Sequence, residues 1–415
     1  MSESPQANPA DMKPPDLLYI ATGVYRMSGN SESKRKLFVS WPDKVPRAAG
    51  YLAVIRVEGT TSPELAIIPE LLEEYLNLKS EAAAVGHPLI GLQIDFDCPA
   101  GKLSIYADFL RRLRTKLPKE DRLSITALLD WFNPGNRIAD ALQWVDEYVP
   151  QFYDVILRSE RNRDSGIAMP IDAAKWAPIF NSYKRPYRVG ISAFGRIAQI
   201  EADSKTVAGA ESSMQTVKEE YYRYSSLLNI MRYGQYKKIS EKMSRAGEKI
   251  LLFKRTDIPN YNKFLKVTIP TKESLLSAYE AAKAMRGFCR GIVFYRWPAK
   301  TETMVLTPDE IGKIISSEKR IDGPIIESRD GYCALVSCTD LYVRLPERFS
   351  EKYVRLRISS STDLEYFIPA ELMKGSQSGI RTIEVKVPPY ESSPSIYLGR
   401  AVTATPPEFR VEEGR

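Results

Sequence analysis

Short apolar runs alternate with longer amphipathic stretches along the first three quarters of the chain. This alternation is typical of parallel strands joined by crossover helices. The runs that we expect to be strands are residues 17–25, 51–58, 91–97, 123–130, 149–154, 187–194, 249–254 and 291–297. Eight parallel strands are the number that closes into a barrel filled by side chains. The pattern therefore predicts an α/β fold, a (β/α)8 TIM-type barrel.

Two helices are well marked. After the third strand, Leu103, Tyr106, Leu110 and Leu113 recur at helical spacing, and Pro118 ends the stretch. We expect this helix on the outside of the barrel. Residues 307–310 place a threonine, a proline and a glutamate in the order of a capping box, which predicts that a last helix begins there.

A long insertion, residues 196–247, separates the sixth and seventh predicted strands. Its stretch 219–236 is rich in tyrosine, arginine and leucine. Insertions after a barrel strand lie on the catalytic rim, so this one is expected to form a lid or else additional helical packing.

After a polar turn at residues 318–324 the apolar period changes to two, as in residues 353–358 and 383–387. This change predicts a small antiparallel β domain at residues 325–415, a β-sandwich, behind a barrel at residues 16–318. Residues 1–15 are rich in serine, proline, asparagine and aspartate. They predict a disordered leader or the remnant of a removed signal, and the sequence does not separate the two.

The charge of +7 arises from 59 basic and 52 acidic residues, which favours an ordinary solvated surface. The basic runs at residues 34–36 and 111–116 are not interleaved with aromatic residues, so we expect no nucleic-acid partner. We also expect no membrane span, because no stretch approaches about 20 apolar residues. The compartment stays open: exported if a signal was removed, and cytoplasmic otherwise.

The cysteines and the histidine argue against several kinds of site. The four cysteines form no CxxC pair and His87 is the only histidine, so neither a zinc site nor a Ser-His-Asp triad is expected. We expect no metal and no other cofactor, since no phosphate loop occurs either. Cys333 and Cys338 are not expected to pair, because an odd spacing on one continuous strand points their side chains to opposite faces.

The third predicted strand carries the main candidate chemistry, in the run Gly-Leu-Gln-Ile-Asp-Phe-Asp-Cys-Pro at residues 91–99. Alternation puts Gln93, Asp95 and Asp97 on the face opposite the apolar residues, and both aspartates at the carboxyl end of the strand. A rise of about 3.3 Å per residue separates their Cα atoms by roughly 6 to 7 Å. One of two such carboxylates should have a raised pKa, which suits a general acid beside a nucleophile or electrostatic stabiliser.

Other predicted strand ends should converge on the same rim. We take Asp95, Asp97, Glu58 and Asp130 as candidate catalytic residues, and Arg56, Trp131, Gln151, Tyr153, Tyr295, Arg296 and Trp297 as candidate substrate-binding residues. Aromatic rings beside carboxylates fit a sugar, whose faces stack on rings while its hydroxyls seek charged partners. The alternatives are structural aspartates that cap a turn or pair with an arginine, a calcium or magnesium site, and aromatic residues that anchor the core.

Three segments resemble the bacterial proteins described as DUF3142. They are GLQIDFDCPAGKLSIYADFLRRLRTKLPKEDRLSITALLDWF, GIVFYRWP and CTDLYVRLPERF. The resemblance runs from Leu17 into the C-terminal domain and implies a glycosidase-like barrel without an assigned reaction. It places Asp95, Asp97 and Cys98 at the acidic strand end, Thr126 and Ala127 on the next strand, and Tyr295 with Arg296 on the last. Pro99 stands where a chitinase-like pattern needs a glutamate, so a chitinase mechanism is not expected.

The residues and the resemblance together predict a carbohydrate-active hydrolase, glycosidase-like, that acts on a polysaccharide or oligosaccharide through acidic residues at the barrel mouth. The alternative is a non-catalytic glycan or cell-envelope binding protein that kept the aromatic rim of a degenerate glycosidase barrel and lost an acid/base pair.

Overall fold

The computed structural model describes residues 14–26, 35–38, 41–42, 45–58, 65–154, 166–202, 214–218, 236–256, 263–298, 304–316, 324–331, 333, 337–345, 349–350, 353–391 and 395–413. The chain divides into two compact units. The first comprises Met1–Glu220, Ser240–Leu252 and Leu265–Ile315, and the second comprises Tyr221–Ile239, Phe253–Phe264 and Ser316–Arg415. In the part of the chain that is described, no helix is both long enough and apolar enough to span a bilayer.

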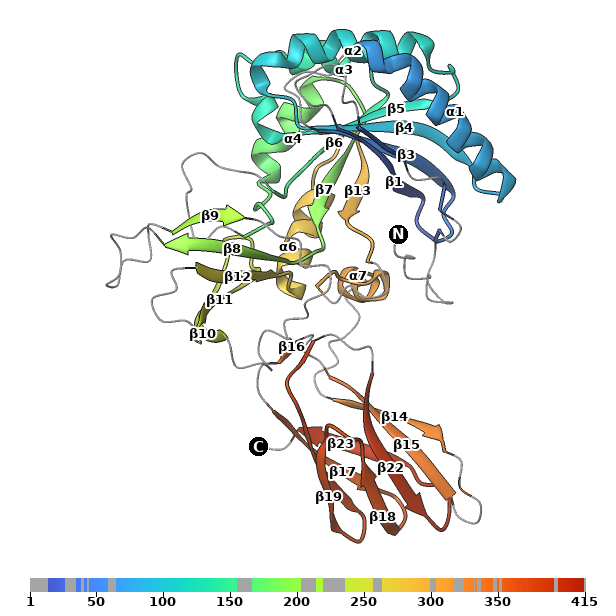
Figure 1. Ribbon diagram of the computed structural model, residues 1–415, viewed down its shortest axis with the longest axis vertical. Helices are drawn as coiled ribbons and strands as arrows, with labels where there is room; N and C mark the ends of the chain where they lie inside the picture. Colours follow the sequence, from blue (N-terminus) through green and yellow to red (C-terminus); the bar gives the residue numbers. More distant parts are fainter. Residues whose placement is uncertain are drawn as a thin grey trace. The chain divides into compact units, whose positions relative to one another are not determined.

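An eight-stranded sheet of order β13-β7-β6-β5-β4-β3-β1-β2 forms the centre of the first unit (Figure 1). Its strands are β1 (Leu17–Arg26), β2 (Arg35–Phe38), β3 (Gly50–Glu58), β4 (Leu89–Phe96), β5 (Arg122–Ala127), β6 (Glu147–Pro150), β7 (Tyr187–Ser192) and β13 (Cys289–Tyr295). Neighbouring strands pair in parallel, except that β2 runs antiparallel to β1. The carboxyl ends of the parallel strands therefore meet along one edge of the sheet, which we call the carboxyl edge.

Helices follow most of these strands. They are α1 (Ile68–Ala84), α2 (Leu103–Lys116), α3 (Ile138–Leu142), α4 (Ala173–Ser182), α6 (Lys272–Lys283) and α7 (Pro308–Ile315), with short 3-10 turns at Leu65–Ile67, Ala100–Lys102 and Leu129–Phe132. Figure 1 shows α1 to α4 together on one side of the strands. The apolar stripe predicted for α2 is buried there, including Tyr106, Leu110 and Leu113. At the start of α7 the predicted capping box is confirmed, because the Glu310 amide donates to the Thr307 hydroxyl and Glu310 accepts from the Thr307 amide.

The predicted closed barrel is wrong. The parallel sheet has β13 and β2 as its edge strands, and no pairing in the described residues joins them. The expected seventh strand is β11 (Lys249–Arg255), which lies instead in a separate sheet of order β10-β11-β12-β8-β9. A short apolar run predicts a strand but not the sheet to which the strand belongs. Because β10 and β12 pair with the two edges of β11, this strand cannot join the parallel sheet. The first unit is therefore an open half-barrel.

The described part of the insertion after β7 contains strands, whereas we expected a lid or additional helical packing. Its described elements are β8 (Arg196–Ala202), β9 (Met214–Lys218) and β10 (Tyr236–Met243), which join β11 and β12 (Lys263–Ile269) in the five-stranded sheet. The tyrosine-rich stretch at residues 219–235 lies outside the described residues. The predicted lid remains a prediction.

The half-barrel curls strongly even though it does not close. Tyr19 of β1 donates a hydrogen bond to Glu147 of β6, although β3, β4 and β5 lie between these strands in the sheet. Arg188 of β7 donates to the second oxygen of Glu147 at 2.8 Å. Burial, followed by the charge of Glu147, raises the pKa of Tyr19. This network joins the amino-terminal halves of the strands across the concave face, and the polar groups of the carboxyl edge lie at the opposite end.

The second unit contains β-strands in the region where the period-two pattern of apolar residues predicts them. They are β14 (Ile325–Asp330), β15 (Ser337–Arg344), β16 (Phe349–Ser350), β17 (Val354–Ser360), β18 (Leu364–Pro369), β19 (Lys374–Gly379), β20 (Thr382–Val387), β21 (Tyr390–Glu391), β22 (Ile396–Thr403) and β23 (Phe409–Glu413). Two four-stranded sheets, β14-β15-β22-β18 and β19-β20-β17-β23, share one core. Leu341, Val343 and Leu398 from the first sheet pack in that core with Ile383 and Val385 from the second.

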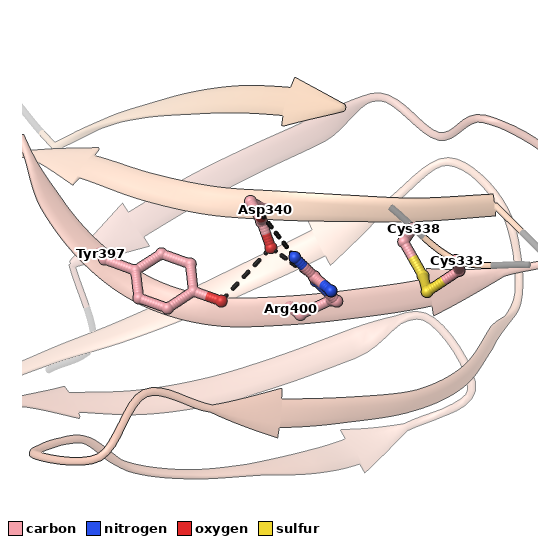
Figure 2. Close-up of a disulfide and its surroundings, with 5 residues drawn as sticks. All are labelled: Cys333, Cys338, Asp340, Tyr397 and Arg400. Atoms are coloured by element: carbon pink, nitrogen blue, oxygen red, sulfur yellow. Dashed lines mark hydrogen bonds and ion pairs between the residues drawn. A yellow bond between two sulfur atoms is a disulfide. The ribbon is translucent and has the colours of Figure 1, made fainter. Parts of the chain in front are cut away.

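A disulfide joins Cys333 and Cys338, with Cα atoms 5.8 Å apart, contrary to our expectation (Figure 2). The argument from one continuous strand fails because only Cys338 belongs to β15, while Cys333 precedes it in the connection from β14. The Gly331 amide donates to the Cys338 carbonyl at 2.8 Å, which closes this hairpin. Side chains alternate between the two faces only along one strand, so this rule does not apply to two residues on opposite arms of a turn. Figure 2 also shows Asp340 bonded to Arg400 and Tyr397 on the neighbouring strand.

Candidate functional site

The carboxyl edge of β4 presents two aspartates, as its alternating sequence predicts. Leu92, Ile94 and Phe96 are buried, and Phe96 packs edge-on against Tyr106 of α2. Gln93, on the opposite face, donates to the Ser124 hydroxyl of β5 at 2.9 Å. The helices thus pack against the apolar face of β4, and the polar face points to the concave side of the half-barrel.

Arg56 of β3 links three carboxylates at this edge. Its guanidinium donates to Asp95 at 2.9 Å, to Asp97 at 3.2 Å and to Glu58 at 2.9 Å. The register explains the first contact, because Arg56 lies directly opposite Asp95 in the β3-β4 pair. A planar guanidinium offers several donors in a fixed fork, so one arginine can hold several carboxylates in place.

The two aspartates of β4 have different surroundings. The Asp95 side chain is 15% exposed and also accepts a hydrogen bond from Thr126 at 2.7 Å. The Asp97 side chain is 53% exposed and accepts a hydrogen bond from one donor group of Arg56 at 3.2 Å. Partial burial and the charge of Asp95 raise the pKa of Asp97, while Arg56 opposes the rise. The raised pKa of Asp97 therefore suits a proton donor, and Asp95 is anchored by two hydrogen-bond donors.

An aromatic pair borders these carboxylates. Tyr153, just after β6, stacks on Tyr295, the last residue of β13, with ring centroids 5.0 Å apart and planes 7° from parallel. Tyr153 is buried, whereas Tyr295 is 41% exposed. Burial, then the neighbouring Tyr295 and Asp95, raises the pKa of Tyr153, and its bond to Gln151 opposes the rise. The structure thus brings Tyr153 and Tyr295 to the predicted rim beside Asp95.

Asp154 is a further member of this cluster that the candidate set omitted. It accepts from Arg196, and its charge contributes to the raised pKa of Asp97. Its backbone has φ of 54°, in the left-handed region that aspartate tolerates better than most residues. Asp154 and Arg196 lie far apart in the sequence, so no local sequence pattern predicts their contact. No local pattern predicts the left-handed backbone of Asp154 either.

The remaining predicted residues are placed less favourably. Trp131 is fully buried and its indole N–H donates to the Cys98 carbonyl at 2.7 Å, so its ring is not available to a ligand. Asp130 is exposed, and it forms no hydrogen bond with the aspartates of β4 among the described residues. Arg296 lies over the Phe194 ring, 6.0 Å from its centroid, and Trp297 is half-buried. We therefore retain Arg56, Glu58, Asp95, Asp97, Gln151, Tyr153, Asp154 and Tyr295 as the candidate site.

Arg56 also decides against the alternative of a cation site. A calcium or magnesium ion needs several oxygen ligands around one point, and here the guanidinium lies between the carboxylates that would provide them. Among the residues that the structure describes, no group of three or more histidine, cysteine, aspartate or glutamate side chains has the arrangement of a metal site.

The family comparison agrees with the resemblance noted in the sequence. Residues 47–224 match the family described as Domain of unknown function (DUF3142). The matched range contains the site residues on β3, β4 and after β6, but not Tyr295. No curated protein matches the chain in sequence.

Several solved structures resemble the chain weakly. The spore cortex-lytic enzyme SleL from Bacillus megaterium has 13% identity and a TM-score of 0.40, over 65% of this chain and 60% of that one. A chitinase from Chromobacterium violaceum has 12% identity and a TM-score of 0.42, over 72% of this chain and 90% of that one. The chitinase ChiW from a Paenibacillus strain has 13% identity and a TM-score of 0.41, over 86% of this chain and 44% of that one. The chain thus spans about 60% of the length of SleL, and TM-scores of this size do not establish a shared fold.

Proposed function

We propose that this chain, whose residues 47–224 belong to the DUF3142 family, is a carbohydrate-active hydrolase that cleaves a glycosidic bond at the carboxyl edge of its half-barrel. The observation that carries the proposal is the asymmetric pair on β4. Asp97 is half exposed with a raised pKa, while Asp95 is held by Arg56 and Thr126. Two carboxyl groups with different roles are what glycoside hydrolysis requires.

The roles follow from these surroundings. Asp97 donates its proton to the glycosidic oxygen as the bond from that oxygen to the sugar carbon breaks. Asp95, anchored by two donors, faces the positive charge that develops on the sugar ring. Water then adds its hydroxyl to the sugar carbon, and its proton returns to the carboxylate of Asp97 by way of solvent. Glu58 and Asp154 contribute further negative charge beside Asp97.

The aromatic pair supplies a surface for the sugar ring. One face of Tyr295 packs on Tyr153, and 41% of Tyr295 stays exposed beside the carboxylates. A ring held in this way has little rotational freedom to lose when a ligand stacks on it. The charged groups around it are suited to the hydroxyl groups of a saccharide.

The test is product formation from a panel of β-1,4-linked oligosaccharides, with and without N-acetyl groups, analysed by mass spectrometry. Asp97→Asn should reduce the rate by about 100-fold or more, and Asp95→Asn by a comparable factor. Asp309→Asn is the matched control, since Asp309 is an exposed aspartate on α7 paired with Lys313, and it should leave the rate unchanged. Cleavage that persists in both site variants would refute the proposal.

One observation favours a second function, non-catalytic glycan binding. Arg56 bonds both aspartates, so a protein that only binds glycan could use the same residues to order its rim. In that case Tyr295→Ala would weaken oligosaccharide binding in calorimetry, and the wild type would release no product during prolonged incubation.

A further inference from the structure

A buried glutamate lies outside the candidate site. Glu248, in the turn between β10 and β11, is only 1% exposed. Its Oε2 accepts hydrogen bonds from the Ala168 amide at 3.0 Å and from the Ser244 hydroxyl at 3.2 Å. The Ser244 hydroxyl accepts in turn from the Glu248 amide at 3.0 Å. The turn is therefore locked around this carboxyl group.

The segment opposite Glu248 is shaped to receive it. A Cβ added to Gly166 would stand 1.8 Å from Glu248 Oε2 and 2.9 Å from the Ser244 side chain. Real Cβ atoms do not approach other atoms so closely, so glycine at this position allows the carboxyl group to reach the Ala168 amide. The fit involves two segments that are about 80 residues apart in sequence, as the Ala168 bond shows.

The same segment carries part of the candidate site on its other side. Ala168 pairs antiparallel with Tyr153, the Asp154 amide donates to the Ile167 carbonyl at 2.9 Å, and the Met169 amide donates to the Phe152 carbonyl at 2.8 Å. We call residues 166–169 the bracing strip. It lies between Glu248 and the two site residues that follow β6.

We propose that Glu248 is a positioning residue whose neutral carboxyl group holds the bracing strip, and through it Tyr153 and Asp154, while ionisation of Glu248 loosens all three. The effect of Glu248 on the bracing strip can be measured in the protein without ligand. Only the expected effect on ligand binding rests on the proposed function.

The unpaired oxygen of Glu248 explains why the neutral form is favoured. Oε1 is buried and has no hydrogen-bond partner among the described residues. An ionised carboxylate with one unsatisfied oxygen is costly in an apolar interior. Burial raises the pKa of Glu248 to about 7, although the Ala168 and Ser244 bonds oppose the rise. Glu248 therefore loses its proton near neutral pH.

The surroundings contain few other titratable groups. Gly166 to Met169 have no ionisable side chain, and Thr271 at the start of α6 binds the neighbouring Gly247 carbonyl through its hydroxyl. Lys266 of β12 lowers the pKa of Glu248, as the last of the causes. Arg245, in the same turn, is exposed. Asp154, which the strip binds, is also ionisable, so a pH response of the bracing strip reports Glu248 where it is absent in Glu248→Gln.

Hydrogen exchange by mass spectrometry tests the structural part without any ligand. In the wild type, protection of the peptides that contain residues 152–154 and 166–169, corrected for intrinsic exchange rates, should fall more than tenfold between about pH 5 and pH 7 and change little above pH 7, because Glu248 ionises near pH 7 when the strip is closed and near its ordinary value when the strip is open. Glu248→Gln keeps an acceptor for Ala168 and cannot ionise, so its protection should not change. Glu241→Gln is the matched control on β10, where the side chain is 42% exposed, and it should behave as the wild type. Constant protection in the wild type, or the same fall in Glu248→Gln, would overturn the inference.

A second variant tests the contact itself. Gly166→Ala must displace the carboxyl group, so it should reduce protection at both pH values. In a Glu248→Ala background, where the clash with Oε2 is gone, Gly166→Ala should reduce the protection of the strip by a smaller factor. An equal loss of protection in the two backgrounds would show that the strip does not depend on Glu248.

Calorimetry with an oligosaccharide that the wild type binds separates the inference from the proposed function. The dissociation constant should rise between about pH 5 and pH 7 in the wild type and markedly less in Glu248→Gln. If protection changes as expected but no oligosaccharide binds at either pH, the proposed function fails and the structural role of Glu248 stands. If binding is as pH-dependent in Glu248→Gln as in the wild type, Glu248 does not position the site.

Discussion

At the scale of single residues, Arg56 is the member of the site that the other charges depend on. It bonds Asp95, Asp97 and Glu58, and it opposes the rise in the pKa of Asp97 that Asp95 and Glu58 cause. The sequence placed Arg56 and these three carboxylates on the same rim, because alternation along β3 and β4 fixes which side chains share a face. It also ended the fifth predicted strand at Asp154, but it could not show the bond between Asp154 and Arg196, which depends on the path of the chain after β6.

Arg56→Ala should therefore destabilise the first unit by about 1 to 2 kcal/mol at neutral pH. Without the guanidinium, the pKa of Asp97, which Arg56 holds down, rises further above its value in the unfolded chain. The cost of ionising Asp97 is absent at low pH and appears as the pH rises towards its folded-state pKa, so the deficit should shrink on acidification from about pH 7 to pH 4.

Urea unfolding of the wild type and the variant at both pH values measures this difference. Arg111→Ala is the matched control, because Arg111 is 44% exposed, close to the 43% of Arg56, but pairs only with Asp108 on the surface of α2. The control should show no measurable change. A deficit of Arg56→Ala that is the same at both pH values would mean that the three carboxylates do not repel one another.

At the scale of elements, period and capping predicted most of the first unit and failed where the pattern is ambiguous. The apolar stripe of α2 and the capping box of α7 each predict only one kind of element, a helix, and both helices are present in the structure. The run at residues 249–254 fits a parallel or an antiparallel strand, and only its neighbours β10 and β12 decide between them. Trp131 shows a similar limit, because a strand-end tryptophan can face a ligand or the core, and here it lies in the core.

The hairpin of β14 and β15 gives a prediction at this scale. The Cys333–Cys338 disulfide closes a short loop, for which the entropy of the unfolded chain implies a stabilisation of about 2 kcal/mol. A reductant should therefore lower the thermal midpoint of the C-terminal sandwich, and it should have no further effect on a variant with Cys333→Ser and Cys338→Ser. Calorimetry of both proteins with and without reductant makes the comparison. Four free thiols in the unreduced, denatured wild type would contradict the pairing.

At the scale of the whole molecule, the described residues form an α/β half-barrel with one core, a separate five-stranded sheet, and a β-sandwich with a second core. The sequence predicted parallel strands and then antiparallel ones, since their periods differ. Closure of a barrel was a different kind of prediction. It depended on a count of strands, and one strand placed in another sheet was enough to make it wrong. The placement of Arg56, Asp95, Tyr153 and Tyr295 at one edge does not require a closed barrel, because these residues belong to strands of the open sheet or follow them directly, and their role stays a prediction.

The central claim is that Asp97 donates a proton during cleavage of a glycosidic bond, and the pH profile of product release tests it most directly. The raised pKa of Asp97 keeps this group protonated to a higher pH than an ordinary aspartate. We predict that the rate constant for the wild type is constant at low pH and falls about tenfold per pH unit above the pKa of Asp97, and that Asp97→Asn lacks this dependence at a much lower rate. A wild-type rate that stays constant from about pH 3 to pH 8, or an Asp97→Asn profile that matches the wild type, would contradict the account.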